Sequence, residues 1–271
     1  MPHYEKKILK NYRIAVFSSA PNAGNHCLVF LVSKELTKRE MQSAAAENGL
    51  SETAFIHLLG NKATLRIFSP LCEMQSCLHA TLAACYVMHH EGLNCELHFG
   101  GGILKPQYVN DELALRIPLL PKAAIEQTTA LVLRKHFINA SSLWPVATAS
   151  QKLRLMIEYA DERSIRAIQA SSFTDIADAF PDIESFFAYA ATDLPNAFIG
   201  RMFAPQLGIS EDPVNGNSCI ALASILSVQT DDLGVLMVRQ AQQCSVEMTI
   251  ENNNALVTAN CCFAELESRG L

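Results

Sequence analysis

The segment that most constrains the fold of this chain is apolar on nearly every side of the helix it would form. It runs from Cys219 to Leu226, behind a polar turn that contains Gly216. A helix that is hydrophobic all round is normally buried on all sides. Together with its first turn, about 11 residues make a rod of about 16 Å, which is long enough to form the centre of a domain. Its N-terminus presents N–H groups that lack intrahelical partners, and these favour an anion.

A second segment of the same design runs from Cys77 to Met88. When the two segments are aligned without gaps, 138 positions apart, Leu78 falls on Gly216 and His79 falls on Asn217. Two unrelated buried helices would show the same pattern. The helices alone therefore allow either a duplicated α/β unit or a chance likeness.

The order of the other elements favours duplication. Thr37 and Glu40 form a capping box that begins a helix, and Gly49 is placed to end it. Two further helices are predicted after the proline-rich stretch at 118–121, at Ala124–Phe137 and Arg163–Gln169. Strands are predicted at Tyr12–Ser18, His26–Val32, Ser51–Leu58, Ala63–Ser69, Cys95–Phe99, Ile103–Val109 and Glu112–Pro118 in the first half, and at Leu153–Tyr159, Phe186–Ala191, Asn196–Ala204, Cys244–Glu251 and Ala255–Leu266 in the second.

Each half is therefore mostly β, with one short helix and one buried helix. This pattern predicts an α+β protein of two pseudo-symmetric lobes, residues 1–121 and 122–271, in which the last strand is able to pack on the first lobe.

Composition excludes several classes of protein. Hydrophobic residues make up 49% of the chain and charged residues 18%, so a sizeable core is expected and disorder is not. No apolar run approaches the length of a membrane span, and no signal peptide is visible, so no membrane partner is expected. The net charge of −6 argues against nucleic acid as the main partner. Nine cysteines, an odd number scattered through predicted elements, indicate thiols in a reducing cytoplasm.

Six short motifs carry a resemblance to a known family. They are Ala23-Gly24-Asn25, Leu50–Phe55, Arg66-Ile67-Phe68-Ser69-Pro70, Cys77–Ala83, Arg201-Met202-Phe203-Ala204-Pro205 and Glu211–Gly216. The chain resembles the PhzF-like family of phenazine biosynthesis, within the diaminopimelate epimerase-like fold. The resemblance spans almost the whole chain and implies two similar lobes, each a mostly antiparallel sheet or barrel wrapped around a central helix. It also implies an active site in the cleft where the two helix N-termini meet, and a homodimer.

Glu52 lies in the Ser-Glu-Thr motif of this resemblance, whose glutamate is the acid/base that transfers a proton. An apolar neighbourhood of Leu50, Ala54, Phe55 and Ile56 would raise the pKa of its carboxyl towards neutrality, where proton transfer is efficient. From the local sequence alone, an exposed strand glutamate is the commoner outcome. The resemblance favours the acid/base role.

His79 and Asp212 match the catalytic histidine and aspartate of the family at the two helix entries. His79 could bind a substrate carboxylate or carry a proton, and Asp212 could orient it. A structural histidine and a plain N-terminal helix cap are the alternatives. The resemblance also assigns substrate binding to Asn25, Cys77, Leu78, Gly216, Asn217 and Ser218.

Two positions depart from the family's motifs. Leu78 replaces a glycine that lets the backbone approach a ligand closely, so a leucine either narrows the pocket or packs into the core. Asn217 stands where the family has a serine, although an amide can also donate a hydrogen bond. Cys77 has Asn215 opposite it rather than a second cysteine, and this argues against a racemase with two thiol bases. A thiol that lines the site is the interpretation that remains for Cys77.

No metal or cofactor is predicted. The spacings of Cys72 and Cys77, His89 and His90, and Cys261 and Cys262 do not form paired zinc ligands. No phosphate-binding or dinucleotide-binding glycine pattern is present. The sequence thus predicts a cofactor-independent isomerase or epimerase that acts on a small carboxylate-bearing metabolite. The alternative is a catalytically impaired relative that binds a small anion or a partner protein in the same cleft.

Overall fold

The computed structural model of the chain describes residues 7–18, 23–100, 102–109, 112–227, 235–240 and 244–264. The chain divides into two compact units, of which the first comprises Met1–Leu115 with Thr258–Leu271 and the second comprises Arg116–Val257. The division falls inside two strands, β9 (Glu112–Pro118) and β17 (Asn254–Ala259). No helix in the described part of the chain is long and apolar enough to cross a bilayer.

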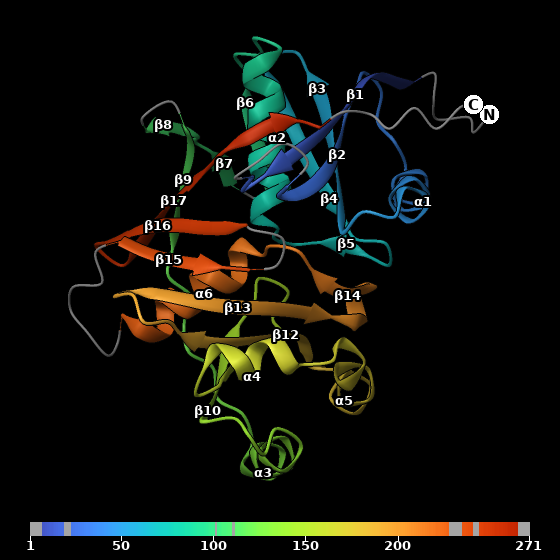
Figure 1. Cartoon of the computed structure of the whole chain (residues 1–271). Helices are drawn as coiled ribbons and strands as arrows, with labels where there is room; N and C mark the ends of the chain where they lie inside the picture. Colours follow the sequence, from blue (N-terminus) through green and yellow to red (C-terminus); the bar gives the residue numbers. More distant parts are fainter. Residues whose placement is uncertain are drawn as a thin grey trace. The chain divides into compact units, whose positions relative to one another are not determined.

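The first unit is built on a mixed sheet with the strand order β18-β1-β2-β3-β4-β6-β7, in which β5 also pairs with β4 (Figure 1). The strands β2 and β3 are parallel, as are β4 and β6, and the other pairs are antiparallel. The bounds are β1 Ile8–Val16, β2 Asn25–Val32, β3 Glu52–Leu59, β4 Lys62–Phe68, β5 Glu73–Met74, β6 Glu96–Phe99, β7 Gly102–Leu104 and β18 Cys261–Phe263. Strands β8 (Gln107–Val109) and β9 form an antiparallel pair that continues the other sheet beyond β17.

Helix α1 (Lys38–Asn48) spans the parallel connection between β2 and β3. Its capping box is confirmed, because the Glu40 amide donates to the Thr37 hydroxyl at 3.2 Å and the Thr37 amide donates to Glu40 Oε2 at 2.7 Å. Gly49 ends the helix with a φ of 70°, a left-handed conformation that suits glycine. Apolar side chains of the helix and the sheet form one cluster, which includes Met41 and Phe55.

Helix α2 (Leu78–His90) is the first central helix. It packs against β1, β2, β3, β4 and β18, so the sheet surrounds it. Every residue from Leu78 to Cys85 is buried, and this confirms that the helix is covered on all sides. An all-apolar helix needs such an enclosure, since its burial removes the whole side-chain surface from water.

The second unit repeats this design with the strand order β10-β11-β12-β13-β15-β16-β17, in which β14 pairs with β13. The bounds are β10 Ser142–Ala147, β11 Leu153–Glu158, β12 Ile183–Ala191, β13 Ala197–Ala204, β14 Ile209–Asp212, β15 Val235–Arg239 and β16 Ser245–Glu251. The central helix α6 (Gly216–Leu226) contacts β11 and β16. Helices α3 (Gln127–His136), α4 (Glu162–Ala167) and α5 (Thr174–Ala179) contribute to a cluster that includes Phe173, Phe186 and Phe203.

Two predicted strands prove to be interrupted. The strand expected at Ile103–Val109 is divided into β7 and β8, because Pro106 lies between them and cannot donate to a sheet. The strand expected at Ala255–Leu266 is divided at Asn260 into β17 and β18, and residues 265 and 266 lie outside the described residues. The elements β5, β10, β14, β15 and α5 were not predicted from the sequence.

Candidate active site

Glu52 is the first residue of β3, which lies between β2 and β4 in the middle of the first sheet. Its side chain is only 2% exposed. Burial raises the pKa of the Glu52 carboxyl to about 7 from an ordinary value near 4.5, although side-chain hydrogen bonds with Ser51 and Cys77 pull it down. The carboxyl group is therefore poised to gain and lose a proton near neutral pH.

Cys77 is the N-cap of α2 and has an extended backbone, with a φ of −153°. Its carbonyl accepts the Thr81 hydroxyl at 2.7 Å and the Thr81 amide at 3.1 Å, which fixes the first turn of the helix. The sulfur does not cap the helix. It lies 3.4 Å from Nδ1 of His79 instead.

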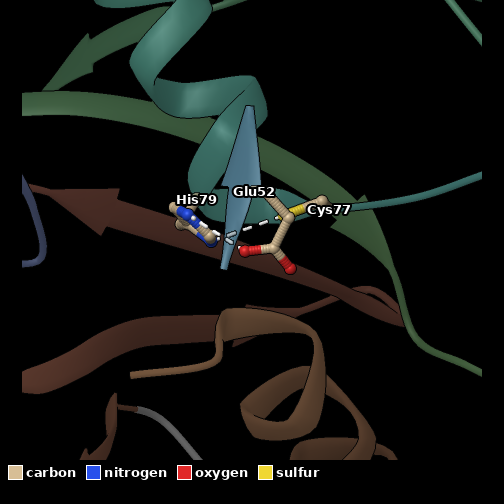
Figure 2. A group of neighbouring side chains, drawn as sticks. All are labelled: Glu52, Cys77 and His79. Carbon is tan, nitrogen blue, oxygen red and sulfur yellow. Dashed lines mark hydrogen bonds and ion pairs between the residues drawn. The ribbon is translucent and has the colours of Figure 1, made fainter. Parts of the chain in front are cut away.

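His79 joins these two groups from the first turn of α2, as Figure 2 shows. Its Nε2 atom lies 3.4 Å from Oε2 of Glu52, and its Nδ1 atom faces Cys77. Asn25, the first residue of β2, brings Nδ2 to 3.5 Å from the same Nδ1 atom. The Ser51 hydroxyl donates to Oδ1 of Asn25 at 3.1 Å, and this orients the amide. The first unit thus gathers an acid, an imidazole, a thiol and an amide, all buried.

The carboxyl group of Glu52 has an oxygen atom that is available to a reacting group. Glu52 Oε2 is buried and has no hydrogen-bond partner in the described part of the chain. Its approach to His79 is an ion-pair distance rather than an aligned hydrogen bond. A buried oxygen without a donor costs stability, on the order of 1–3 kcal/mol. Such a cost is typical of an atom that is kept available for a reacting group.

Glu52, Cys77 and His79 also form the one group in the described part of the chain that could hold a metal ion, with ligand atoms within 4.8 Å of one another. Sulfur and nitrogen donors suit zinc rather than calcium or magnesium. The sequence contains no pair of ligands at the spacing of a zinc site. A group drawn from two elements that are far apart in sequence leaves no such signature.

The second unit places a different set of groups at its helix entry. Asn215 is the N-cap of α6, and its Oδ1 accepts both the amide and the hydroxyl of Ser218 at 2.8 Å. Its Nδ2 donates to Oδ2 of Asp212 at 2.8 Å, and its backbone amide donates to Gln240 at 2.9 Å. Gln240 also donates to Sγ of Cys219 at 3.1 Å, where burial raises the pKa of the thiol well above its usual value. Asp212 therefore orients the cap of the helix.

The other predicted substrate-binding residues lie at the same two helix entries. Leu78 is the first residue of α2 and is 5% exposed. Gly216 is the first residue of α6 and is buried, and Asn217 follows it and is partly buried. Their binding of a substrate, as implied by the resemblance, stays a prediction. Two residues that the structure places at these entries were assigned no role from the sequence. Ser51 lies in the Ser-Glu-Thr motif but was not expected to orient Asn25, and Gln240, just after β15, lies in no motif.

Comparison with known proteins gives concordant results. The family model described as phenazine biosynthesis-like protein matches residues 14–253. An uncharacterized isomerase of Pseudomonas aeruginosa is 29% identical over 248 residues, which cover 88% of this chain and 87% of that protein.

Two solved structures show the fold. A putative phenazine biosynthesis PhzC/PhzF protein of Clostridium difficile matches with a TM-score of 0.73 at 20% identity, over 96% of this chain and 99% of that one. A hydroxyproline epimerase from Agrobacterium vitis, solved with bound trans-4-hydroxy-L-proline, matches with a TM-score of 0.56 at 11% identity, over 93% of this chain and 87% of that one. The chain therefore has the α+β diaminopimelate epimerase-like fold.

Proposed function

The chain belongs to the phenazine biosynthesis-like PhzC/PhzF family, and we propose that it is a cofactor-independent isomerase or epimerase that moves a proton on a small carboxylate-bearing metabolite. The buried Glu52 carboxyl, with a pKa of about 7 beside His79, carries the proposal. A general acid/base works best when its pKa lies near the working pH, because both of its protonation states are then populated. The named isomerase among the relatives supports the same reaction class.

Glu52 acts as the proton carrier. Its carboxylate form removes a proton from a carbon atom of the substrate, and its acid form returns the proton at another face or another carbon. The Oε2 atom suits this role because no donor in the described part of the chain holds it. His79, at 3.4 Å, stabilises the charge that appears on the carboxylate or on the substrate.

Asn25 and Ser51 position the imidazole rather than react. The Ser51 hydroxyl holds Oδ1 of the Asn25 amide, so Nδ2 faces Nδ1 of His79. With Nδ1 as an acceptor, the neutral ring carries its proton on Nε2, the atom that faces Glu52. The proposal further includes a homodimer in the cytoplasm, which light scattering of the purified protein and fractionation of cells would test.

A deuterium wash-in screen tests the function. Amino acids and cyclic carboxylates are incubated with the protein in D₂O, and incorporation is followed by mass spectrometry. Exchange is expected for at least one compound, is lost in Glu52→Gln and persists in Cys77→Ala. Glu47→Gln is the matched control, since Glu47 is an exposed glutamate of the same unit. Exchange should also survive EDTA, because the proposal assigns proton transfer to Glu52 without a metal ion; exchange lost in EDTA and restored by zinc would contradict this part of it.

The alternative is a relative that binds but does not catalyse. Binding of panel compounds in calorimetry, without exchange of any of them, would establish that alternative and overturn the isomerase. Exchange that continues undiminished in Glu52→Gln would remove Glu52 from the mechanism while leaving the reaction class intact.

A further inference from the structure

The thiol, imidazole and carboxyl groups of the first unit meet in one buried cluster that contains a nucleophile, a base and an acid. Sγ of Cys77 lies 3.4 Å from Nδ1 of His79, and Nε2 of the same ring lies 3.4 Å from Oε2 of Glu52 (Figure 2). The thiol and the carboxyl group therefore face different nitrogen atoms of the ring. Nucleophilic catalysis needs a base within reach of the nucleophile and a third group that orients the base.

We propose that Cys77 is a nucleophile that accepts acyl groups from activated carboxylic esters and thioesters, an activity distinct from proton transfer by Glu52. His79 is the base of this reaction, and Glu52 is a positioning residue that acts through His79.

The hydrogen-bond donors around the ring support this assignment. Nδ2 of Asn25 is a donor that faces Nδ1, because Oδ1 of the same amide accepts from Ser51, and the Cys77 thiol faces the same Nδ1 atom. Nδ1 is therefore the nitrogen that carries the lone pair, and it is placed to take the proton of the thiol. The imidazolium that results keeps its other N–H towards Glu52, where a carboxylate stabilises it.

The position of Cys77 in the helix adds a means of stabilising an oxyanion. Cys77 is the N-cap of α2, a helix of 13 residues. Helix geometry gives the first-turn amides, such as those of Leu78 and Ala80, no intrahelical acceptor. Because Cys77 is the N-cap, its side chain is at the positive end of the helix dipole, and these N–H groups would stabilise an oxyanion formed on an acyl group attached to the sulfur.

The reaction balances without an oxidant or another co-reactant. The thiol proton passes to His79, the sulfur–carbon bond forms, and the carbon–oxygen or carbon–sulfur bond to the leaving group breaks. The leaving group takes the proton from His79 and departs as an alcohol or thiol. Water then attacks the thioester, His79 takes and returns its proton, and the products are a carboxylic acid and the original Cys77 thiol.

The test uses p-nitrophenyl acetate with the full-length protein, so no natural substrate is needed. A burst of p-nitrophenolate is expected, followed by slower turnover. Mass spectrometry of peptides should then place the acetyl group on Cys77. Two other thiols serve as internal controls. Cys72 is the more exposed thiol, and Cys85 lies on the same helix, where burial raises the pKa of its thiol to about 12. Acetylation of Cys72 at a rate equal to or above that of Cys77 would overturn the proposal.

The acetylation rates of variants show whether His79 acts as a base or only packs against Cys77. Cys77→Ser should abolish the thioester, and His79→Ala should slow acetylation by on the order of 10²-fold or more. Free imidazole should restore part of the rate in His79→Ala, which a purely structural histidine would not allow. Glu52→Gln should reduce the rate by on the order of 10-fold, with partial recovery in Glu52→Asp. Unchanged acetylation in both His79→Ala and Glu52→Gln would refute the assignment even if Cys77 reacts.

The outcome is independent of the isomerase proposal. Proton exchange is expected to depend on Glu52 as the proton carrier, whereas formation of the acetyl thioester depends on the sulfur of Cys77. Deuterium exchange without acetylation would contradict the proposal for Cys77 and leave the isomerase proposal intact. Acetylation without exchange would contradict the isomerase proposal and leave the proposal for Cys77 intact.

Discussion

The two units repeat one frame with different chemistry inside it. Along β1-β2-β3-β4-β6-β7 the strand pairs run antiparallel, parallel, antiparallel, parallel and antiparallel. Along β10-β11-β12-β13-β15-β16 the same sequence of pairs occurs. The central helix connects the second parallel pair in both units, as α2 between β4 and β6 and as α6 between β13 and β15. Such agreement is what a duplicated unit would retain.

The residues that support each central helix are also repeated. In the first unit the Arg66 guanidinium donates to both carboxylate oxygens of Glu73, at 2.6 and 2.8 Å, and lies over the Phe68 ring. In the second unit Arg201 donates to both oxygens of Glu211, each at 2.7 Å, and lies over the Phe203 ring. Each pair joins a sheet strand to the short strand before the helix, so it fixes where the helix begins.

The buried ionisable groups differ between the units. Parallel pairing sets Glu52 opposite Cys27 in the first unit, and the equivalent pair in the second unit is Ser185 opposite Arg154. Arg154 donates to the Ser185 hydroxyl at 2.9 Å. The first unit therefore has a buried acid, and Oε2 of that acid lacks a hydrogen bond. At the equivalent position the second unit has a serine whose hydroxyl oxygen accepts a hydrogen bond from an arginine. The two units therefore share the frame, while the buried acid at the position of Glu52 is found in the first unit alone.

The largest expected effect comes from replacing the buried acid that distinguishes the first unit from the second. Glu52→Gln should lower deuterium exchange by on the order of 10³-fold, because the amide can neither take nor return a proton. Ser185→Ala, the change at the equivalent position, should leave exchange within about twofold. Equal losses in the two variants, measured on folded protein, would contradict the assignment of proton transfer to the first unit.

The next effect is on the pH dependence of stability. The pKa of Glu52 is about 7 in the folded chain and near 4.5 when the group is not buried. The folded protein thus holds a proton that the unfolded chain has lost. Its stability is fully present below pH 4.5 and falls as the pH rises through about 7, by about 3 kcal/mol in total. In urea unfolding from pH 5 to pH 8, the free energy of unfolding of Glu52→Gln should increase relative to that of the wild type as the pH rises. The free energy of unfolding of Ser185→Ala should change with pH as that of the wild type does. Parallel curves for Glu52→Gln and the wild type would contradict a buried acid.

Local signals in the sequence were sufficient to predict much of the frame. The capping box at Thr37 and the glycine at 49 predicted α1 correctly, because both act within one helix. The all-round apolar runs predicted both central helices, because only burial makes such a composition stable. Pro106 was a visible signal as well, and its effect on the strand around it was overlooked.

The site could be predicted only in part. Cys77 and His79 are two residues apart, so their proximity could be expected. The approach of Glu52 depends on how β3 packs against α2, and no local pattern encodes that contact. The same holds for Gln240, which reaches Asn215 from 25 positions further along the chain. Side chains that meet through tertiary packing are the part that sequence reasoning alone leaves open.

A smaller effect on stability is expected from changing a glycine that makes room for an aromatic ring in the core of the second unit. A Cβ atom on Gly200 would lie 2.2 Å from Cζ of Phe187, so Gly200→Ala should cost about 2 kcal/mol through overpacking. Strand register places Leu65 and Ala54 at the equivalent positions of the first unit, which reverses the large and small residues.

The double variant Phe187→Ala with Gly200→Leu copies that arrangement. Its loss of stability in urea unfolding should be smaller than the sum of the two single losses by at least about 1 kcal/mol. Additive losses would show that the large and small side chains at these positions cannot be interchanged in the second unit.

The smallest effect concerns the two arginine–glutamate pairs, which are not equally connected. Arg201 also donates to the carbonyls of Ile165 and Ile168, at 3.2 and 2.7 Å, and so ties α4 to β13. Glu73, the partner of Arg66, retains a second cation in Lys38 at 3.4 Å. Arg201→Gln leaves two carbonyls and a carboxylate without their donor, whereas Arg66→Gln leaves a carboxylate that still has a lysine. We therefore expect Arg201→Gln to destabilise the chain by about 1 kcal/mol more than Arg66→Gln in urea unfolding. Added salt should reduce both losses without reversing their order, because two of the bonds lost with Arg201 end on neutral carbonyls. A larger loss for Arg66→Gln would mean that the first unit depends more on its pair, and the two copies of the frame would then differ in support as well as in chemistry.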